Sequence, residues 1–136
     1  MMLLVDACVW SLSLRRRPGA AFNTEQQHLL SELQQAIGEG RVSLLGAIRQ
    51  EVLSGVRDKA LFLKIRRLLA PFPDEDVIPA DYVEAARLYN LCLDGGVQCG
   101  SIDMLIAAVA ERKNFTVLTY DRALIRCLEV LEIPRV

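Results

Sequence analysis

Short apolar runs, separated by longer segments with helical periodicity, constrain the fold of this 136-residue chain most strongly. Three of the runs have strand length, at Met2–Val5, Val42–Leu45 and Thr116–Thr119. They are apolar along most of their length and lack strict alternation, which is typical of strands buried on both faces of a parallel sheet. A briefer run at Val77 and Ile78, directly before Pro79, predicts one more strand.

Helices are predicted between these strands. Asn23–Glu39 carries apolar residues at spacings of three and four, with Thr24 and Gln27 placed as a capping box. Asp81 and Glu84 form a second capping pattern, ahead of a helix that ends near Gly95. Helical composition also marks AIRQEVLSGV, which contains Glu51, then Lys59–Ala70 and DMLIAAVAERK, which begins at Asp103.

This alternation of strands and helices favours one three-layer α/β/α domain over residues 1–136. Its central sheet is expected to be mainly parallel, with about four or five strands, because uniformly apolar strands need cover on both faces. No internal repeat, linker or low-complexity tract interrupts the pattern.

The apolar content of 52% predicts a large core or a buried subunit face, since no apolar run approaches the roughly 18 residues of a membrane span. The N-terminal segment reaches an acid at Asp6 and lacks a basic start, unlike a secretory signal, so a cytoplasmic location without a membrane partner is expected. The four cysteines contain no CxxC pair and are interpreted as buried free thiols.

Sixteen Lys and Arg residues against seventeen Asp and Glu give a net charge of −1, so affinity for nucleic acid would need local basic patches. One candidate patch is the triple arginine Arg15, Arg16 and Arg17, which could contact RNA phosphates. A second group is Lys64, Arg66 and Arg67, for which an ordinary solvated helix face is an equally good interpretation. Trp10 is interpreted as a core residue.

Acidic residues follow the predicted strands at the end where parallel sheets bind ligands. Asp6, Glu51 and Asp121 each come after a strand, and Asp103 lies at the start of a helix. Taken singly, each could be a helix cap, a partner of the helix dipole or a solvated residue. Four carboxylates in one crevice would raise each other's pKa, however, so their convergence requires a counter-charge such as a divalent cation.

The type of ligand restricts which cation the site can bind and which reaction it can support. Zinc prefers imidazole or thiolate, and the chain has a single histidine, His28, and no paired Cys/His motif, so Mg²⁺ or Mn²⁺ is favoured. Magnesium commonly bridges carboxylates to phosphate oxygens and activates water, which suits hydrolysis of phosphodiester bonds.

Four segments in order, LLVDACVW, GAIRQEVLSGVR, SIDMLIAAVA and VLTYD, resemble the acidic motifs of PIN-domain ribonucleases, most closely the VapC-type toxins of bacterial toxin–antitoxin pairs. The resemblance implies a Mg²⁺- or Mn²⁺-dependent endoribonuclease that acts on RNA, forms a homodimer and is bound by a cognate antitoxin. It places Asp6, Glu51, Asp103 and Asp121 at the catalytic and metal-binding positions. Thr119 and Ser101 match the supporting polar positions.

The sequence departs from that family at two places. Ala7 replaces the Thr or Ser that often follows the first acid, and no further acid or amide follows closely after Asp121. These departures leave open the number of metals and a non-catalytic PIN-fold binding protein as an alternative. A receiver-like phospho-acceptor domain is a weaker alternative, because a fitting acid pair and a lysine after the last strand are missing.

Overall fold

The computed structural model describes residues 1–15 and 19–136, and its centre is a small parallel sheet. Strands β1 (Leu3–Val5), β2 (Val42–Ser43) and β3 (Thr116–Leu118) lie in the order β2-β1-β3, so the first strand of the chain is the middle one. Leu4 pairs with Ser43 on one side and with Val117 on the other. All residues of these strands are buried, as their apolar composition predicts.

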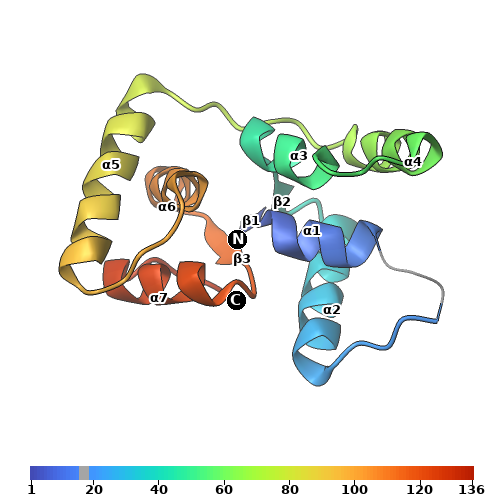
Figure 1. Cartoon of the computed structure of the whole chain (residues 1–136), viewed down its shortest axis with the longest axis horizontal. Coiled ribbons are helices and arrows are strands. Elements are labelled where there is room, and N and C mark those ends of the chain that lie inside the picture. Colours follow the sequence, from blue (N-terminus) through green and yellow to red (C-terminus); the bar gives the residue numbers. More distant parts are fainter. Residues whose placement is uncertain (16–18) are drawn as a thin grey trace.

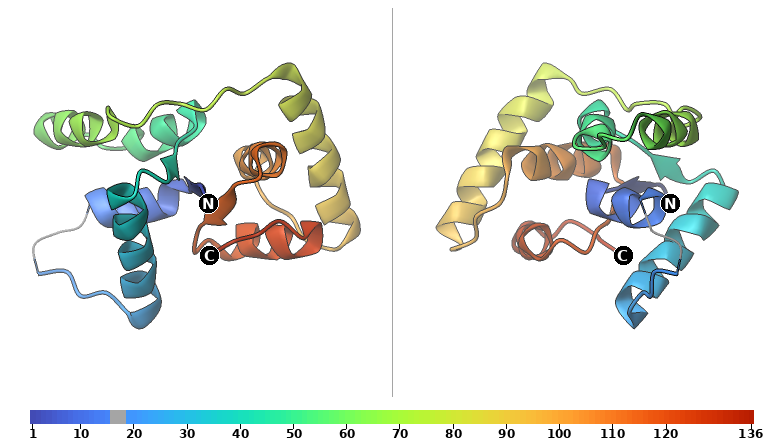
Figure 2. Two further views of the ribbon diagram at one scale, coloured as in Figure 1. Left: turned by 180° about the vertical axis from the view of Figure 1, so that it is seen from behind. Right: turned by 45° about the vertical axis from the view of Figure 1, so that its right-hand side comes forward.

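Seven helices surround the strands of the described chain in two groups, one on each side of the sheet (Figures 1 and 2). In Figure 1, the helices of residues 7–69 lie to the right of the strands and those of residues 79–131 to the left. The helices are α1 (Ala7–Leu14), α2 (Thr24–Gly38), α3 (Gly46–Leu53), α4 (Lys59–Leu69), α5 (Pro79–Asp94), α6 (Ser101–Lys113) and α7 (Arg122–Leu131). This arrangement confirms the predicted α/β fold with helices on both sides of a parallel sheet.

Helix α6 forms the centre of one layer. Seven consecutive residues, Met104–Ala110, are buried, so this helix is enclosed on all sides as its continuous apolar sequence predicts. Trp10 on α1 is also buried and packs at an angle against Phe72. None of the helices within the described residues is long and apolar enough to cross a membrane.

The sheet is smaller than predicted, with three strands in the described chain where four or five were expected. Val77 and Ile78 do not form a strand, because Ile78 is the N-cap of α5 and Pro79 is its first residue. Near them a single bridge, between Leu44 and Asp74, extends the pairing of β2. Proline at the first helical position favours a helix start, and this outweighs the strand preference of two β-branched residues.

Two capping assignments shift, by one residue in α2 and by three residues in α5. The capping box of α2 is formed by Asn23 and Gln26, whose side chains each accept from the other's backbone N–H, where Thr24 and Gln27 were predicted. Asp81 lies inside the first turn of α5, where its carboxylate accepts from the backbone N–H of Ile78, so the predicted Asp81–Glu84 pair is not the cap. Helices α1 and α7 had not been predicted as separate elements.

Asp81 also forms a partly buried ion pair between two helices. Its carboxylate accepts hydrogen bonds from Nε and Nη2 of Arg112 at 2.7 and 2.8 Å. The Asp81 side chain is 3% exposed, and Arg112 also donates to the backbone carbonyl of Asp76. The hydrogen bonds from Arg112 are the main cause of a lowered pKa of Asp81. This ion pair connects the first turn of α5 to the last turn of α6.

The prediction of four free thiols was wrong for two of the cysteines. Cys99, which follows α5, is joined by a disulfide to Cys127 of α7. Cys92 is free and buried, while Cys8 is free and only partly buried. The pairing joins residues 28 positions apart in the sequence, so no local spacing motif announces it.

Candidate active site

Asp6 lies at the carboxyl end of the central strand and begins helix α1. Its Oδ1 accepts a hydrogen bond from the backbone N–H of Ala7 at 2.8 Å, so the side chain caps α1. Its own backbone N–H donates to the carbonyl of Leu118, which ties it to the end of β3. Only 5% of Asp6 is exposed. The acid that follows β1 is therefore held in place by both backbone and side-chain contacts.

Thr119 connects Asp6 to Asp121 across the end of β3. The Thr119 hydroxyl donates to Oδ2 of Asp6 at 2.8 Å and accepts from the backbone N–H of Asp121 at 3.1 Å. Asp121 in turn caps α7, where its Oδ1 accepts from the N–H of Leu124. One buried hydroxyl thus fixes the position of two acids that come from different strands.

Asp103 and Glu51 approach this pair from α6 and α3. Burial, followed by the negative charge of Asp6, raises the pKa of Asp103 to about 6, and Asp121 and Glu51 add to the shift. The pKa of Glu51 is also raised, first by partial desolvation of its carboxylate and then by the charges of Asp6 and Asp121. Asp103 therefore responds to the charges of the other three acids, and Glu51 to those of Asp6 and Asp121, so the four acids lie near one another.

The four carboxylates are gathered more loosely than the ligands of a closed metal cage. No three of them, among the described residues, bring one oxygen each within 4.8 Å of the others. Magnesium retains several waters and usually takes only one or two protein carboxylates directly, so a loose group of acids suits it better than a tight cage does. Oxygen-only donors, of which Asp103 and Glu51 have raised pKa values, fit a hard divalent cation that neutralises their charge.

The two supporting residues differ in burial, and the candidate basic residues that the structure describes are exposed. Thr119 is buried within the site, whereas Ser101 is an exposed first residue of α6. Arg15 is exposed at the C-terminal end of α1, and Arg16 and Arg17 lie outside the described residues. The second predicted group, Lys64, Arg66 and Arg67, is exposed on α4.

Cys8 is a site residue that the sequence analysis did not identify. Its thiol donates to Oδ2 of Asp6 at 3.2 Å and lies 3.5 Å from the hydroxyl of Thr119. Burial, followed by the charge of Asp6, raises the pKa of Cys8 to about 12, so the thiol remains protonated and available as a donor. Asp6 therefore has a side-chain donor from the residue after Ala7, although Ala7 itself has no hydroxyl.

Replacing Thr119 by Val is expected to lower the free energy of unfolding by about 1–2 kcal/mol, because a buried N–H and a buried carboxylate each lose a partner. Urea unfolding measures this change. The control is Thr116→Val, the same substitution at the opposite end of β3, which should have the smaller effect. Equal losses in the two variants would show that the Thr119 hydroxyl does not hold the site together.

The family model described as "PIN domain" matches residues 3–127. The solved structure of FitAcB from Neisseria gonorrhoeae is similar over 98% of this chain and 96% of its own, with a TM-score of 0.65 and 23% sequence identity. At that identity the likeness shows a common fold. No curated protein sequence matches the chain significantly.

Proposed function

The chain belongs to the PIN domain family, and from this we propose that it is a metal-dependent endoribonuclease of the VapC type, the toxin of a toxin–antitoxin pair. The observation that supports the proposal is the proximity of Asp6, Glu51, Asp103 and Asp121, because burial together with the charges of the other three acids raises the pKa of Asp103 to about 6. A protein that only binds a partner would have no reason to keep these mutually repelling charges together.

We assign Asp6, Asp103 and Asp121 to the binding of Mg²⁺ or Mn²⁺, and Glu51 either to the same task or to the orientation of water. The cation supplies charge neutralisation at the phosphate and activation of a water molecule. The division of roles follows the degree of restraint. Asp6 is fixed by three hydrogen bonds, whereas Glu51 is exposed on α3 and has more freedom to orient a water.

RNA must reach an acidic crevice on a protein of net charge −1, so cationic side chains near it are required. Arg15 at the end of α1 is the described candidate of the triple arginine, and the exposed Lys64, Arg66 and Arg67 on α4 form the second. We propose that Arg15, with the two arginines that follow it in the sequence, contacts phosphates, since Arg15 lies at the end of the helix that begins at Asp6.

The test is cleavage of total RNA by the purified protein with Mg²⁺, with Mn²⁺ or with EDTA. We expect products only when a cation is present, because the carboxylates repel the phosphates without it. The Asp6→Asn variant provides the background lane, and Asp94→Asn, an exposed acid at the end of α5, should cleave like the wild type. Equal cleavage in every lane would identify a contaminating nuclease, and no cleavage anywhere would favour the non-catalytic binding protein.

We further propose a homodimer and a cognate antitoxin as partners. The support on this chain is a set of exposed apolar side chains along α5 and at the start of α6, which include Tyr82, Val83 and Ile102. Light scattering at micromolar concentration should give about twice the protomer mass of 15.2 kDa. A mass of one protomer would contradict the dimer, and failure of a co-expressed antitoxin to suppress toxicity would contradict the pairing.

A further inference from the structure

Three cysteines that play no part in the carboxylate site meet in the interior of the protein. Cys92 lies on α5, Cys99 on the segment between α5 and α6, and Cys127 on α7. Their sulfur atoms all lie within 4.8 Å of one another, and the three residues are buried. Cys99 and Cys127 are joined as a disulfide, so the free thiol of Cys92 lies beside an existing S–S bond.

The disulfide closes a covalent ring around the second half of the candidate active site. The residues between Cys99 and Cys127 include the whole of α6 and β3, and with them Asp103, Thr119 and Asp121. Cys99 directly precedes Gly100, whose backbone N–H donates to Oδ2 of Asp103. A change in the bonding of Cys99 therefore affects the segment that precedes Asp103 and contacts its carboxylate.

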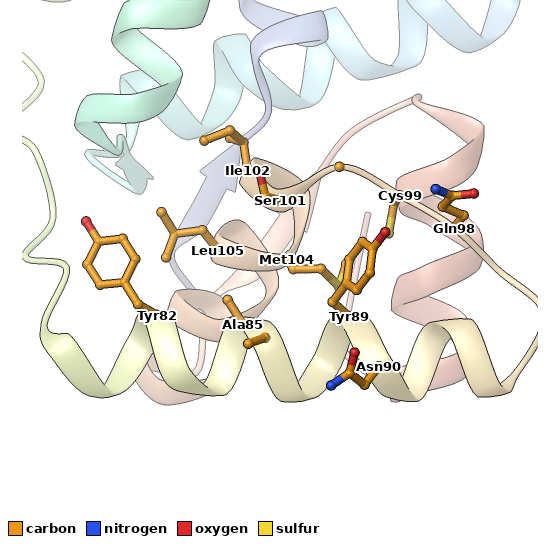
Figure 3. A pocket seen from close by; sticks show the side chains of 12 residues that line it. Tyr82, Ala85, Tyr89, Asn90, Gln98, Cys99, Ser101, Ile102, Met104 and Leu105 are labelled. Carbon is orange, nitrogen blue, oxygen red and sulfur yellow. The ribbon is translucent and has the colours of Figure 1, made fainter.

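Only one of the three sulfurs is open to a small molecule. Cys99 lines a pocket of about 700 Å³ between α5 and α6, together with Tyr89, Gln98 and Met104 (Figure 3). Its exposed fraction is 8%, compared with 1% for Cys92 and 0% for Cys127. A small oxidant or thiol that enters this pocket would reach Cys99 before either of the other two cysteines.

We propose that Cys92, Cys99 and Cys127 form a thiol–disulfide exchange site. Oxidation of the Cys99 and Cys127 thiols by glutathione disulfide forms their S–S bond, and the two protons and two electrons pass to the oxidant as two molecules of glutathione. In the exchange step the Cys92 thiolate attacks Sγ of Cys127, a Cys92–Cys127 bond forms and the Cys99–Cys127 bond breaks. The electron pair leaves on Sγ of Cys99, which then takes up a proton.

Cys99 is the leaving sulfur because it is the one with access to solvent through the pocket, and a thiolate is stabilised by water. The buried position of Cys92 raises the pKa of its thiol, so exchange is slow at neutral pH and faster in alkali. After exchange the bond joins α5 to α7, so the closed ring grows to residues 92–127, which still include Asp103, and Cys99 is no longer part of the bond. The segment before α6 then has a free thiol at the pocket wall.

The first experiment maps the bonds of the intact protein after incubation with glutathione disulfide. Cys92 and Cys99 lie on one tryptic peptide, but a protease that cleaves before Asp94 separates them, so trypsin and this protease are combined. Mass spectrometry without reduction should show Cys99 linked to Cys127, with a growing fraction of Cys92 linked to Cys127 at pH 9. Absence of both linkages would overturn the proposal.

Two variants distinguish thiol–disulfide exchange by Cys92 from formation of the Cys99–Cys127 bond. Cys99→Ser removes the original partner, and we expect oxidation to link Cys92 to Cys127; a Cys92 that stays alkylatable would overturn the exchange. Cys92→Ser should keep the Cys99–Cys127 bond and show no new linkage at pH 9. In this variant, reduction should lower the melting temperature by roughly 10 °C, the usual scale for loss of a structural disulfide. An unchanged melting temperature would contradict the presence of a Cys99–Cys127 bond that closes the ring.

Three converging thiols would also suit a soft cation such as Zn²⁺, which requires all three in the reduced state. The purified protein is therefore assayed for bound zinc and for thiols that react only after a chelator is added. One zinc per chain with three protected thiols would overturn the exchange site. These readouts follow bonds and melting, so they are independent of whether the protein cleaves RNA.

Discussion

Asp103→Asn is expected to lower RNA cleavage by about a thousandfold and to raise the melting temperature of the metal-free protein. The loss follows because a charged ligand is removed from a site where electrostatic stabilisation typically supplies factors of this size. The gain follows because burial and the charges of Asp6, Asp121 and Glu51 disfavour the ionised Asp103. An amide of the same shape has no charge to repel them.

The pH dependence of this gain has a definite sign. The folded protein raises the pKa of Asp103 to about 6, above the value in an unfolded chain, so protonation of Asp103 favours the folded state. The stability contribution is complete below the unfolded pKa and is lost as pH rises through about 6. The free energy of unfolding of the metal-free wild type should therefore be lower at pH 7 than at pH 5, by on the order of 1 kcal/mol once solvent screening is allowed for, and its melting temperature should be lower at pH 7.

Thermal melts of wild type and Asp103→Asn in EDTA at pH 5 and pH 7 measure the effect, and RNA cleavage is followed in parallel with Mg²⁺. Asp94→Asn serves as the control, since Asp94 is exposed at the end of α5. If Asp103→Asn melts lower than the wild type at pH 7, the carboxylate is stabilising and the charge-repulsion account is wrong. If it cleaves RNA at the wild-type rate, Asp103 is not a metal ligand.

Arg112→Ala should destabilise the protein by about 3 kcal/mol, because it leaves the buried carboxylate of Asp81 without its partner. The matched control is Arg87→Ala. This variant breaks an exposed ion pair within α5, between Arg87 and Glu84, and should lower the free energy of unfolding by less than about 1 kcal/mol. Urea unfolding at pH 7 compares the two variants, and similar losses would show that the Asp81–Arg112 pair is no stronger than a surface pair.

The same pair gives stability a second dependence on pH, opposite in sign to that of Asp103. Arg112 lowers the pKa of Asp81 in the folded protein, so the ionised carboxylate favours folding. This contribution is present above the unfolded pKa of Asp81 and is lost as pH falls through the lowered folded value. In Arg112→Ala the loss of stability towards acid should therefore be less steep than in the wild type.

The proximity of the four acids could be predicted from the sequence because each acid is positioned by a local pattern. Asp6 and Asp121 each follow an apolar run that could be recognised as a buried strand, and parallel strands present their carboxyl ends at one edge of the sheet. Glu51 and Asp103 were located by helical patterns beside that edge. The electrostatic coupling among the four acids in the structure agrees with this reasoning.

The features that sequence reasoning missed depend on contacts between distant residues. Val77 and Ile78 have strand composition, but Pro79 makes them the entry to α5. Cys99 meets Cys127 only because α5, α6 and α7 pack together, and nothing near either residue indicates that pairing. The thiol of Cys8 reaches Asp6 through the first turn of α1, a helix that the sequence analysis did not predict.

The order of the sheet also determines when the crevice can form during synthesis. The middle strand, β1, leaves the ribosome first, but one of its two neighbours, β3, follows more than a hundred residues later. Asp103, Thr119 and Asp121 arrive with that late segment, so a nascent chain has only half of the acids and lacks one side of its sheet. For the proposed nuclease, this order means that the four acids are not yet together while most of its own messenger RNA is being translated.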